Sequence, residues 1–281
     1  MFVSSLLDRI VDGALAEDLE GGDLTTEATV PSDARAVARA VARTALVVCG
    51  ADVFARVFYR VDPSVRVELL MDEGSDAKQG DVLWVAEGSA RSLLMAERTA
   101  LNFAQRMSGI ATLARSYVRA LPAGSKARVT DTRKTTPGLR ALERYAVRTG
   151  GAHNHRDTLG SAVLIKDNHI QAAGGIGVAV ERARARAPHT SKIEVEVASL
   201  AELDQALAAG ADIVMLDNFA EADVATGVAR AKGKALVEVS GGITLERIAS
   251  LAAAGVDVIS SGALTHSAPS ADIALDLERL G

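Results

Sequence analysis

Short apolar runs alternate with longer stretches of helical periodicity through the second half of the chain. The runs occupy 127–130, 162–165, 192–197, 212–216, 235–239 and 256–260, and helical patterns lie between them near 137–149, 171–187, 199–210, 221–232 and 244–254. Strands separated by helices in this way indicate βαβ units and a parallel sheet. Right-handed crossovers in series favour a barrel or partial barrel. A doubly wound sheet is the alternative, but no G-x-G-x-x-G sequence follows the first run.

The first hundred residues carry a different pattern. Residues 4–19 have helical spacing, and short β-like runs recur at 45–49, 65–70 and 82–86. Residues 34–43 are ambiguous by period, although their alternation of Ala with Arg and Val can indicate a strand. A long helical pattern then covers roughly 90–120. Together these features predict a small α+β module that precedes the βα array.

Polar residues follow each apolar run of the array. They include Asp131, Arg133 and Lys134 after the first run, Lys166 after the second, Asp217 after the fourth, Ser240, Gly241 and Gly242 after the fifth, and Ser260 and Gly262 after the sixth. The third run carries Glu194 and Glu196 on one face. Because the carboxyl ends of parallel strands meet at one rim, we expect these side chains to share a site. Asp, Asn, Ser and Gly also favour turns and caps, which leaves the cations as the more informative residues.

Cations next to carboxylates and Gly-rich loops suggest a site for anions and a divalent metal. Segment 131–156 has six Lys or Arg residues against two acidic ones, a local charge of +4. Arg133 and Arg156 lie at element ends, where a guanidinium can bind a carboxylate with two hydrogen bonds. Arg140, Arg144 and Arg148 recur on one helical face, which fits an exposed basic stripe as well as substrate contact.

The composition excludes some classes of protein. The 281 residues include 31 Lys and Arg against 36 Asp and Glu, which gives a net charge of −5, and aromatic residues make up only 3%. These values disfavour a nucleic-acid binder. No apolar stretch approaches the roughly 20 residues that span a bilayer, and no signal peptide is evident. We therefore expect a cytoplasmic protein without a membrane segment.

Other common centres have weak support. Cys49 lies in an apolar run and is expected to be a buried, inert thiol. His153 and His155 could supply two metal ligands, but no third soft ligand lies nearby in the sequence, which disfavours zinc. No G-x-S-x-G elbow accompanies a Ser-His-Asp set. A hydrogen bond from His155 to an anionic substrate is the preferred interpretation of that histidine.

Several motifs together resemble the quinolinate phosphoribosyltransferase family. They are TRKTTPGLR (132–140), NHR (154–156), LIKDNHI (164–170), EVEV (194–197), LDNF (216–219), SGGI (240–243) and GALTHS (262–267). EDLEGGDLTT (17–26) and ERTALNFAQRMSGIAT (97–112) resemble the N-terminal part of the same family. The resemblance covers almost the whole chain in order, and this agreement is more specific than any one motif.

The resemblance implies a type II phosphoribosyltransferase fold, with an N-terminal α/β sandwich and an incomplete, seven-stranded α/β barrel. The corresponding domains are 1–110 and 111–268, and 269–281 is expected to return to the N-terminal domain. The implied reaction transfers phosphoribosyl from phosphoribosyl pyrophosphate to quinolinate with decarboxylation, giving nicotinate mononucleotide, CO2 and pyrophosphate in NAD biosynthesis. A paralogue with another acceptor, or a non-catalytic anion-binding protein, is the alternative.

Site roles also follow from the resemblance. Quinolinate-binding positions match Arg133, His155, Arg156 and Lys166, together with Arg98 from a neighbouring subunit. Lys134, Glu196 and Asp217 match the catalytic residues that contact phosphoribosyl pyrophosphate, with Glu196 and Asp217 as ligands of Mg2+. The phosphate loops match Ser240, Gly241, Gly242, Ser260 and Gly262. A homodimer or higher homo-oligomer is therefore expected. Ala152, His153 and Ser161 depart from the family pattern next to the quinolinate positions.

Overall fold

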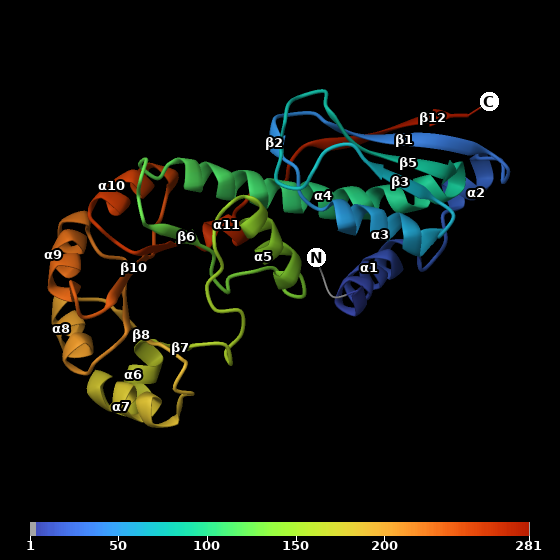
Figure 1. Cartoon of the computed structure of the whole chain (residues 1–281). Coiled ribbons are helices and arrows are strands. Elements are labelled where there is room, and N and C mark those ends of the chain that lie inside the picture. Colours follow the sequence, from blue (N-terminus) through green and yellow to red (C-terminus); the bar gives the residue numbers. More distant parts are fainter. Residues whose placement is uncertain (1–3, 281) are drawn as a thin grey trace. The chain divides into compact units, whose positions relative to one another are not determined.

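The computed structural model describes residues 4–280 and divides them into two compact units (Figure 1). Unit 1 comprises the residues up to 115, residues 136–151 and the residues from 268 onward, and unit 2 comprises 116–135 and 152–267. The boundaries expected from the sequence, near 110 and 268, differ from this division mainly at 136–151, which group with unit 1. Within the described range, no helix is both long and apolar enough to cross a membrane.

Unit 1 is built on a four-stranded antiparallel sheet in the order β12-β1-β5-β3. Its strands are β1 (Arg35–Ala42), β3 (Arg66–Leu69), β5 (Val82–Ser89) and β12 (Ile273–Arg279), and a separate pair joins β2 (Leu46–Val47) to β4 (Asp76–Ala77). The helices of the unit are α1 (Ser4–Leu19), α2 (Leu24–Thr29), α3 (Ala51–Val61), α4 (Ala90–Arg119) and α5 (Arg140–Thr149). Figure 1 shows α3 and α4 along one face of this sheet.

The ambiguous segment 34–43 forms strand β1. Ala36, Ala38 and Ala40 are fully buried, whereas the residues between them are partly exposed. Arg39 and Arg43 form ion pairs with Glu278 and Asp276 of β12. The period of two therefore reflects one face packed on the helices and one face turned toward solvent.

A buried glutamate explains why 136–151 groups with unit 1. The Glu143 carboxylate accepts hydrogen bonds from the Arg106 guanidinium and from the backbone and hydroxyl of Thr136. Arg106 also donates to the carbonyl of Ala268. Because a buried carboxylate must be paired, these bonds tie α5 to α4. Cys49 is fully buried as expected, and burial raises the pKa of its thiol.

Unit 2 contains a six-stranded parallel sheet in the order β6-β11-β10-β9-β8-β7. Its strands are β6 (Arg128–Thr130), β7 (Val163–Ile165), β8 (Ile193–Val197), β9 (Ile213–Asp217), β10 (Leu236–Ser240) and β11 (Val258–Ser260). An isolated parallel bridge between Thr130 and His153 extends the free edge of β6 and takes the place of a seventh strand. This arrangement confirms an incomplete barrel.

Helices surround the sheet of unit 2 on the outside (Figure 1). They are α6 (Asp167–Ala173), α7 (Ile176–Arg186), α8 (Leu200–Ala208), α9 (Glu221–Ala231), the 3-10 helix η1 (Leu245–Arg247), α10 (Ile248–Ala253) and α11 (Ala263–His266). The single helix expected over 171–187 is two helices. Gly174 and Gly175 have φ of 93° and 138° and cannot continue a right-handed helix, so α6 ends there and α7 begins.

Each barrel strand has one apolar and one more polar face. Val195, Leu216 and Val239 share the face that packs under the helices and are almost fully buried. The opposite face, at the intervening positions, lines the interior with Glu196, Asp217, Glu238, Ser240 and Ser260 among others. The alternation therefore places polar side chains inside the barrel and apolar side chains between the sheet and the surrounding helices.

Candidate functional site

A cleft of about 490 Å³ opens at the carboxyl edge of the unit 2 sheet. It is lined by Thr132, Arg133, Lys134, His155, Arg156, Leu164, Lys166, Glu196, Met215, Asp217, Asn218, Glu238, Ser240, Gly241, Gly242 and Ser260. Every strand of the sheet contributes residues from its carboxyl half or from the loop that follows it, and His155 and Arg156 come from the segment that precedes β7. This is the edge at which barrels of this type carry their chemistry.

Most of the site residues expected from the sequence line this one cleft. Among those of unit 2, only Gly262 is outside the lining, and a Cβ on it would lie 3.0 Å from Cδ of Lys134, so it packs directly behind a lining residue. Arg98 belongs to unit 1, where it lines a separate hollow of about 440 Å³ together with Asn102 and Phe103. Arg140, Arg144 and Arg148 do not line the cleft, and Arg144 is buried.

The guanidinium groups of Arg133 and Arg156 both line the cleft, and each carries a positive charge. Nε of Arg133 is buried and has no hydrogen-bond partner. Burial, together with the positive charge of Arg133, lowers the pKa of Arg156, whose Nη1 donates to the carbonyl of Ala162. Two like charges in a half-buried place repel each other, and a bound anion would relieve both the repulsion and the unsatisfied Nε.

The second cationic group is formed by two lysines. Nζ of Lys166 is paired with the carboxylate of Glu196 across the ends of β7 and β8. Lys134 is exposed, and its backbone is held by Thr132 and Thr265: its N–H donates to Oγ1 of Thr132, and its carbonyl accepts from Oγ1 of Thr265. The backbone of Lys134 is therefore fixed, whereas its exposed ammonium group is placed to contact an anionic ligand.

The loops that follow β9 and β10 pack against each other and hold the carboxylate of Asp217. Asn218 has a φ of 56°, its N–H donates to the carbonyl of Ser240, and its Nδ2 donates to Oδ2 of Asp217. Gly241 lies against it, since a Cβ there would come within 2.2 Å of Oδ1 of Asn218. Glycine is required at 241 both by this approach and by its φ of 86°. The sequence placed Asn218 at the end of a strand, in the LDNF motif, but gave it no specific role.

His155 lies between two buried glutamates inside the barrel. Its Nε2 is 3.3 Å from Oε2 of Glu194 and 3.4 Å from Oε1 of Glu238, and its Nδ1 accepts the backbone N–H of Arg156 at 2.8 Å. Burial lowers the pKa of His155, but the two carboxylates outweigh it and raise the pKa to about 10. The hydrogen bond to Nδ1 favours the neutral ring instead, because a ring nitrogen that accepts a hydrogen bond carries no proton. In either protonation state Nε2 carries a proton, and that proton faces the two carboxylates.

Glu194 and Glu238 therefore contact a residue of the site. The sequence grouped Glu194 with the other site residues without a specific role, and it did not single out Glu238. Burial raises the pKa of Glu194, the His155 ring lowers it, and the nearby Glu238 carboxylate raises it again. The signal that could have found Glu238 is its place as a single acid within the apolar run ALVEV. An ionisable residue at a buried strand position needs a partner, and the alternation of the strand points it into the barrel.

The residues that depart from the family pattern lie outside the cleft lining. His153 is exposed and forms the bridge to β6 through its backbone. The hydroxyl of Ser161 accepts the N–H groups of Asp157 and Thr158 and closes the exposed loop at 157–161. Ala152 is buried. None of the three presents a side chain among those that line the cleft.

Two family models together cover nearly the whole chain. The model of the quinolinate phosphoribosyl transferase N-terminal domain matches residues 23–108, and that of the C-terminal domain matches residues 110–276. The chain belongs to the quinolinate phosphoribosyl transferase family. The second match contains every residue that lines the cleft.

Relatives of known name support this assignment to the quinolinate phosphoribosyl transferase family. The chain is 45% identical over 271 residues to a nicotinate-nucleotide pyrophosphorylase [carboxylating] from Mycobacterium leprae, which covers 94% of both chains. A probable enzyme of the same name from Synechocystis is 42% identical and covers 98% of this chain and 93% of its own. The crystal structure of NadC from Streptococcus pyogenes matches with a TM-score of 0.94 at 40% identity, covering 100% of this chain and 99% of that one.

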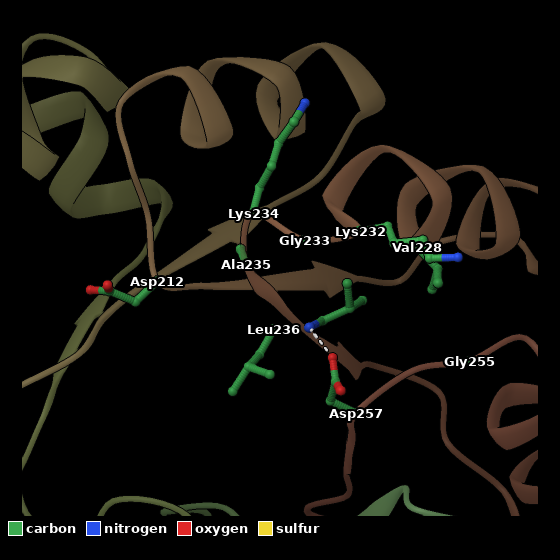
Figure 2. A pocket seen from close by; sticks show the side chains of 10 residues that line it. Asp212, Val228, Lys232, Gly233, Lys234, Ala235, Leu236, Gly255 and Asp257 are labelled. Carbon is green, nitrogen blue, oxygen red and sulfur yellow. Dashed lines mark hydrogen bonds between the residues drawn. The ribbon is translucent and has the colours of Figure 1, made fainter.

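A second hollow of unit 2, of about 600 Å³, lies at the other ends of the strands (Figure 2). Its two acids are used by the backbone: Asp212 accepts the N–H of Ile193, and Asp257 accepts the N–H of Val237. Figure 2 shows the side chain of Lys234 extending away from the strands. The hollow thus holds the amino ends of the strands in register and brings no reactive groups together.

Proposed function

We propose that this chain transfers a phosphoribosyl group from phosphoribosyl pyrophosphate to quinolinate and releases the 2-carboxylate, giving nicotinate mononucleotide, CO2 and pyrophosphate for NAD biosynthesis. The observation that carries the proposal is the pair Arg133 and Arg156 in the cleft of a chain from this family. Nε of Arg133 has no hydrogen-bond partner, and burial together with the charge of Arg133 lowers the pKa of Arg156. Relatives that match over nearly the full length of both chains are named for this activity.

Quinolinate is a dianion, and the basic side of the cleft suits it. Arg133 and Arg156 can each bind a carboxylate with paired hydrogen bonds. Lys166 can supply a further cation when it exchanges Glu196 for the substrate, and His155 belongs to the same group by the family resemblance. Arg98 is assigned to this group from a neighbouring subunit, which makes the protein at least a homodimer and each site a product of two chains.

The pyrophosphate-bearing sugar is assigned to the opposite side of the cleft. Lys134 can hold its phosphates as a point charge, and the loops at Ser240, Gly241, Gly242, Ser260 and Gly262 offer hydroxyl and backbone N–H donors. Oγ of Ser260 is buried and has no hydrogen-bond partner. An unused buried donor at this position supports its assignment to an oxygen-rich ligand.

The donor set fits Mg2+. Glu196 and Asp217 supply carboxylate oxygens, the ligand type that Mg2+ prefers, and both line the same cleft from neighbouring strands. Mg2+ commonly binds through one or two carboxylates plus substrate phosphates, which is consistent with the pairing of Glu196 with Lys166 before substrate arrives. When bound, the ion would neutralise charge on the departing pyrophosphate.

The chain's own residues act mainly by position and charge. The pyridine nitrogen of quinolinate already has a lone pair, so no side chain must remove a proton to make the nucleophile. As the pyrophosphate leaves, positive charge grows on the ribose, and the carboxylates of Glu196 and Asp217 can stabilise it. Lys134 can stabilise the leaving group. After transfer, loss of CO2 leaves an electron pair on C2, which the adjacent cationic ring nitrogen stabilises, and C2 then takes a proton in place of the carboxylate.

The remaining expectations belong to the same proposal. A small-molecule transferase of net charge −5 is assigned no nucleic-acid partner and a cytoplasmic location. The test is an acceptor comparison: purified protein is incubated with phosphoribosyl pyrophosphate, Mg2+ and either quinolinate or nicotinate. We expect nicotinate mononucleotide from quinolinate alone. A preference for nicotinate would instead assign the chain to a paralogue with another acceptor.

A further inference from the structure

The short segment 153–156 enters the barrel next to β6 and carries two of the lining residues. Three buried carboxylates contact it. Asp131 accepts the Nδ2 group of Asn154 at 2.6 Å and the backbone N–H of His155 at 2.8 Å. The carboxylates of Glu194 and Glu238 lie 3.3 Å and 3.4 Å from Nε2 of His155. The segment that bears Arg156 is thus fixed at its backbone and at the histidine side chain.

The ring of His155 is already engaged by the protein at both nitrogens. Nε2 faces the glutamates, and Nδ1 faces the N–H of Arg156. Glu194 also interacts favourably with the charge of Arg156. The histidine therefore links the two glutamates to the backbone of the arginine that follows it.

The same three side chains could in principle hold a metal, since one ligand atom from each lies within 4.8 Å of the others. The hydrogen bond at Nδ1 disfavours this. A neutral histidine that ligates through Nε2 must carry its proton on Nδ1, where it would meet the N–H of Arg156 head-on. The arrangement fits a hydrogen-bonded cluster whose Nε2 keeps its proton.

We propose that Glu194 and Glu238 are positioning residues that hold His155 and thereby aim Arg156 at a carboxylate of the acceptor. This inference rests on the proposed function for the identity of the acceptor. Two acids at the floor of an anion site would otherwise oppose binding, because they are only 5% and 3% exposed and little screened by water. Their presence is explained if they fix the position of Arg156, because an arginine that is already held in place loses less entropy when it binds a ligand.

The test compares KM for the two substrates in two variants of Glu238. Glu238→Ala removes one of the two carboxylates that face Nε2 of His155, whereas Glu238→Gln keeps a side-chain oxygen at the same distance from the backbone. We expect Glu238→Ala to raise KM for quinolinate about tenfold, the scale of a lost hydrogen bond to a charged group, with KM for phosphoribosyl pyrophosphate within about twofold. Glu238→Gln should restore KM for quinolinate to within about threefold. Glu181→Gln, an exposed position on α7, is the matched control and should leave both values unchanged.

A second readout needs no substrate and no catalysis. Nitrogen NMR of the histidine rings, with His155 assigned through His155→Gln, should show Nε2 protonated between pH 6 and pH 9. Metal analysis of the same sample should find no stoichiometric ion that the His155→Gln variant lacks. Because this measurement is independent of turnover, an inactive protein with this NMR signature would overturn the proposed function and leave the cluster intact.

Three results would overturn the inference. One is an unchanged KM for quinolinate in folded Glu238→Ala, and another is an equal rise in KM for both substrates. The third is an unprotonated Nε2 together with a bound metal, which would make the cluster a metal site. If Glu238→Ala does not fold, the comparison passes to Glu194→Gln and Glu238→Gln and to the NMR of the unaltered protein, where an unprotonated Nε2 alone rejects the proposal.

Discussion

The contact between Gly241 and Asn218 makes a sharp prediction about the phosphate side of the cleft. In Gly241→Ala, the new Cβ would lie 2.2 Å from Oδ1 and 2.9 Å from the backbone nitrogen of Asn218, at a φ of 86°. The left-handed conformation alone costs about 1–2 kcal/mol for an alanine. Relief of the overlap requires Asn218 to move, and overpacking of this kind adds about 1–3 kcal/mol. We therefore expect unfolding to become easier by about 2–5 kcal/mol.

Two other glycines of unit 2 provide controls. Gly210 has a φ of 78° with no atom within 4 Å of the added Cβ, and Gly242 has a φ of 58° with only a guanidinium nitrogen of Arg247 at 3.6 Å. Alanine at either position should cost only the conformational part, about 1–2 kcal/mol. The difference between Gly241→Ala and these variants then measures the steric contact with Asn218.

Urea unfolding and steady-state kinetics test both parts of the argument. Because Asn218 holds Asp217 by a hydrogen bond, its displacement should raise KM for phosphoribosyl pyrophosphate in Gly241→Ala but not in Gly210→Ala. KM for quinolinate should change less than KM for phosphoribosyl pyrophosphate. Equal stability and equal KM in Gly241→Ala and Gly210→Ala would refute the reasoning.

Three further predictions concern the substrate assignments. Arg133→Ala should weaken quinolinate binding at least tenfold more than phosphoribosyl pyrophosphate binding in calorimetry, because its guanidinium is assigned to a carboxylate; equal losses would contradict that assignment. Asp217→Ala should lower kcat and raise the Mg2+ concentration needed for half activity, and an unchanged Mg2+ titration would count against Asp217 as a ligand. Inactive Arg98→Ala and Asp217→Ala subunits, mixed after dissociation, should regain up to about a quarter of wild-type activity, since a hybrid dimer keeps one intact shared site. No recovery in a mixture shown to contain hybrids would reject Arg98 as a residue supplied across the interface.

The barrel could be predicted because its strands carry a local signal. Val195 and Glu196, or Val239 and Ser240, alternate between a helix-covered face and the barrel interior, and the polar residues after each run mark the carboxyl edge. Helix ends were harder: Gly174 and Gly175 divide a pattern that is continuous in its apolar spacing. Period alone also left segment 34–43 open, because its strand character depends on pairing with β5 and β12, which are distant in sequence.

The site was easier to predict where side chains follow strands than where they lie within them. Arg133, Lys166 and Asp217 stand at strand ends and could be grouped from the sequence. Glu238 stands within a run, and His155, which it faces, is 83 residues earlier, so their contact depends on the order of the strands in the sheet. The backbone bond to Nδ1 of His155 has no sequence signature at all. The net charge of −5 likewise gave no sign of a basic cleft, since it averages over the whole surface.

The most direct test of the central claim follows the carboxylate that the reaction removes. Quinolinate labelled at the 2-carboxylate is incubated with the protein, phosphoribosyl pyrophosphate and Mg2+, and labelled CO2 and nicotinate mononucleotide are measured together. The account predicts that both appear in equal amounts and that neither forms without phosphoribosyl pyrophosphate. Labelled CO2 without the nucleotide, or a nucleotide that retains the label, would contradict it.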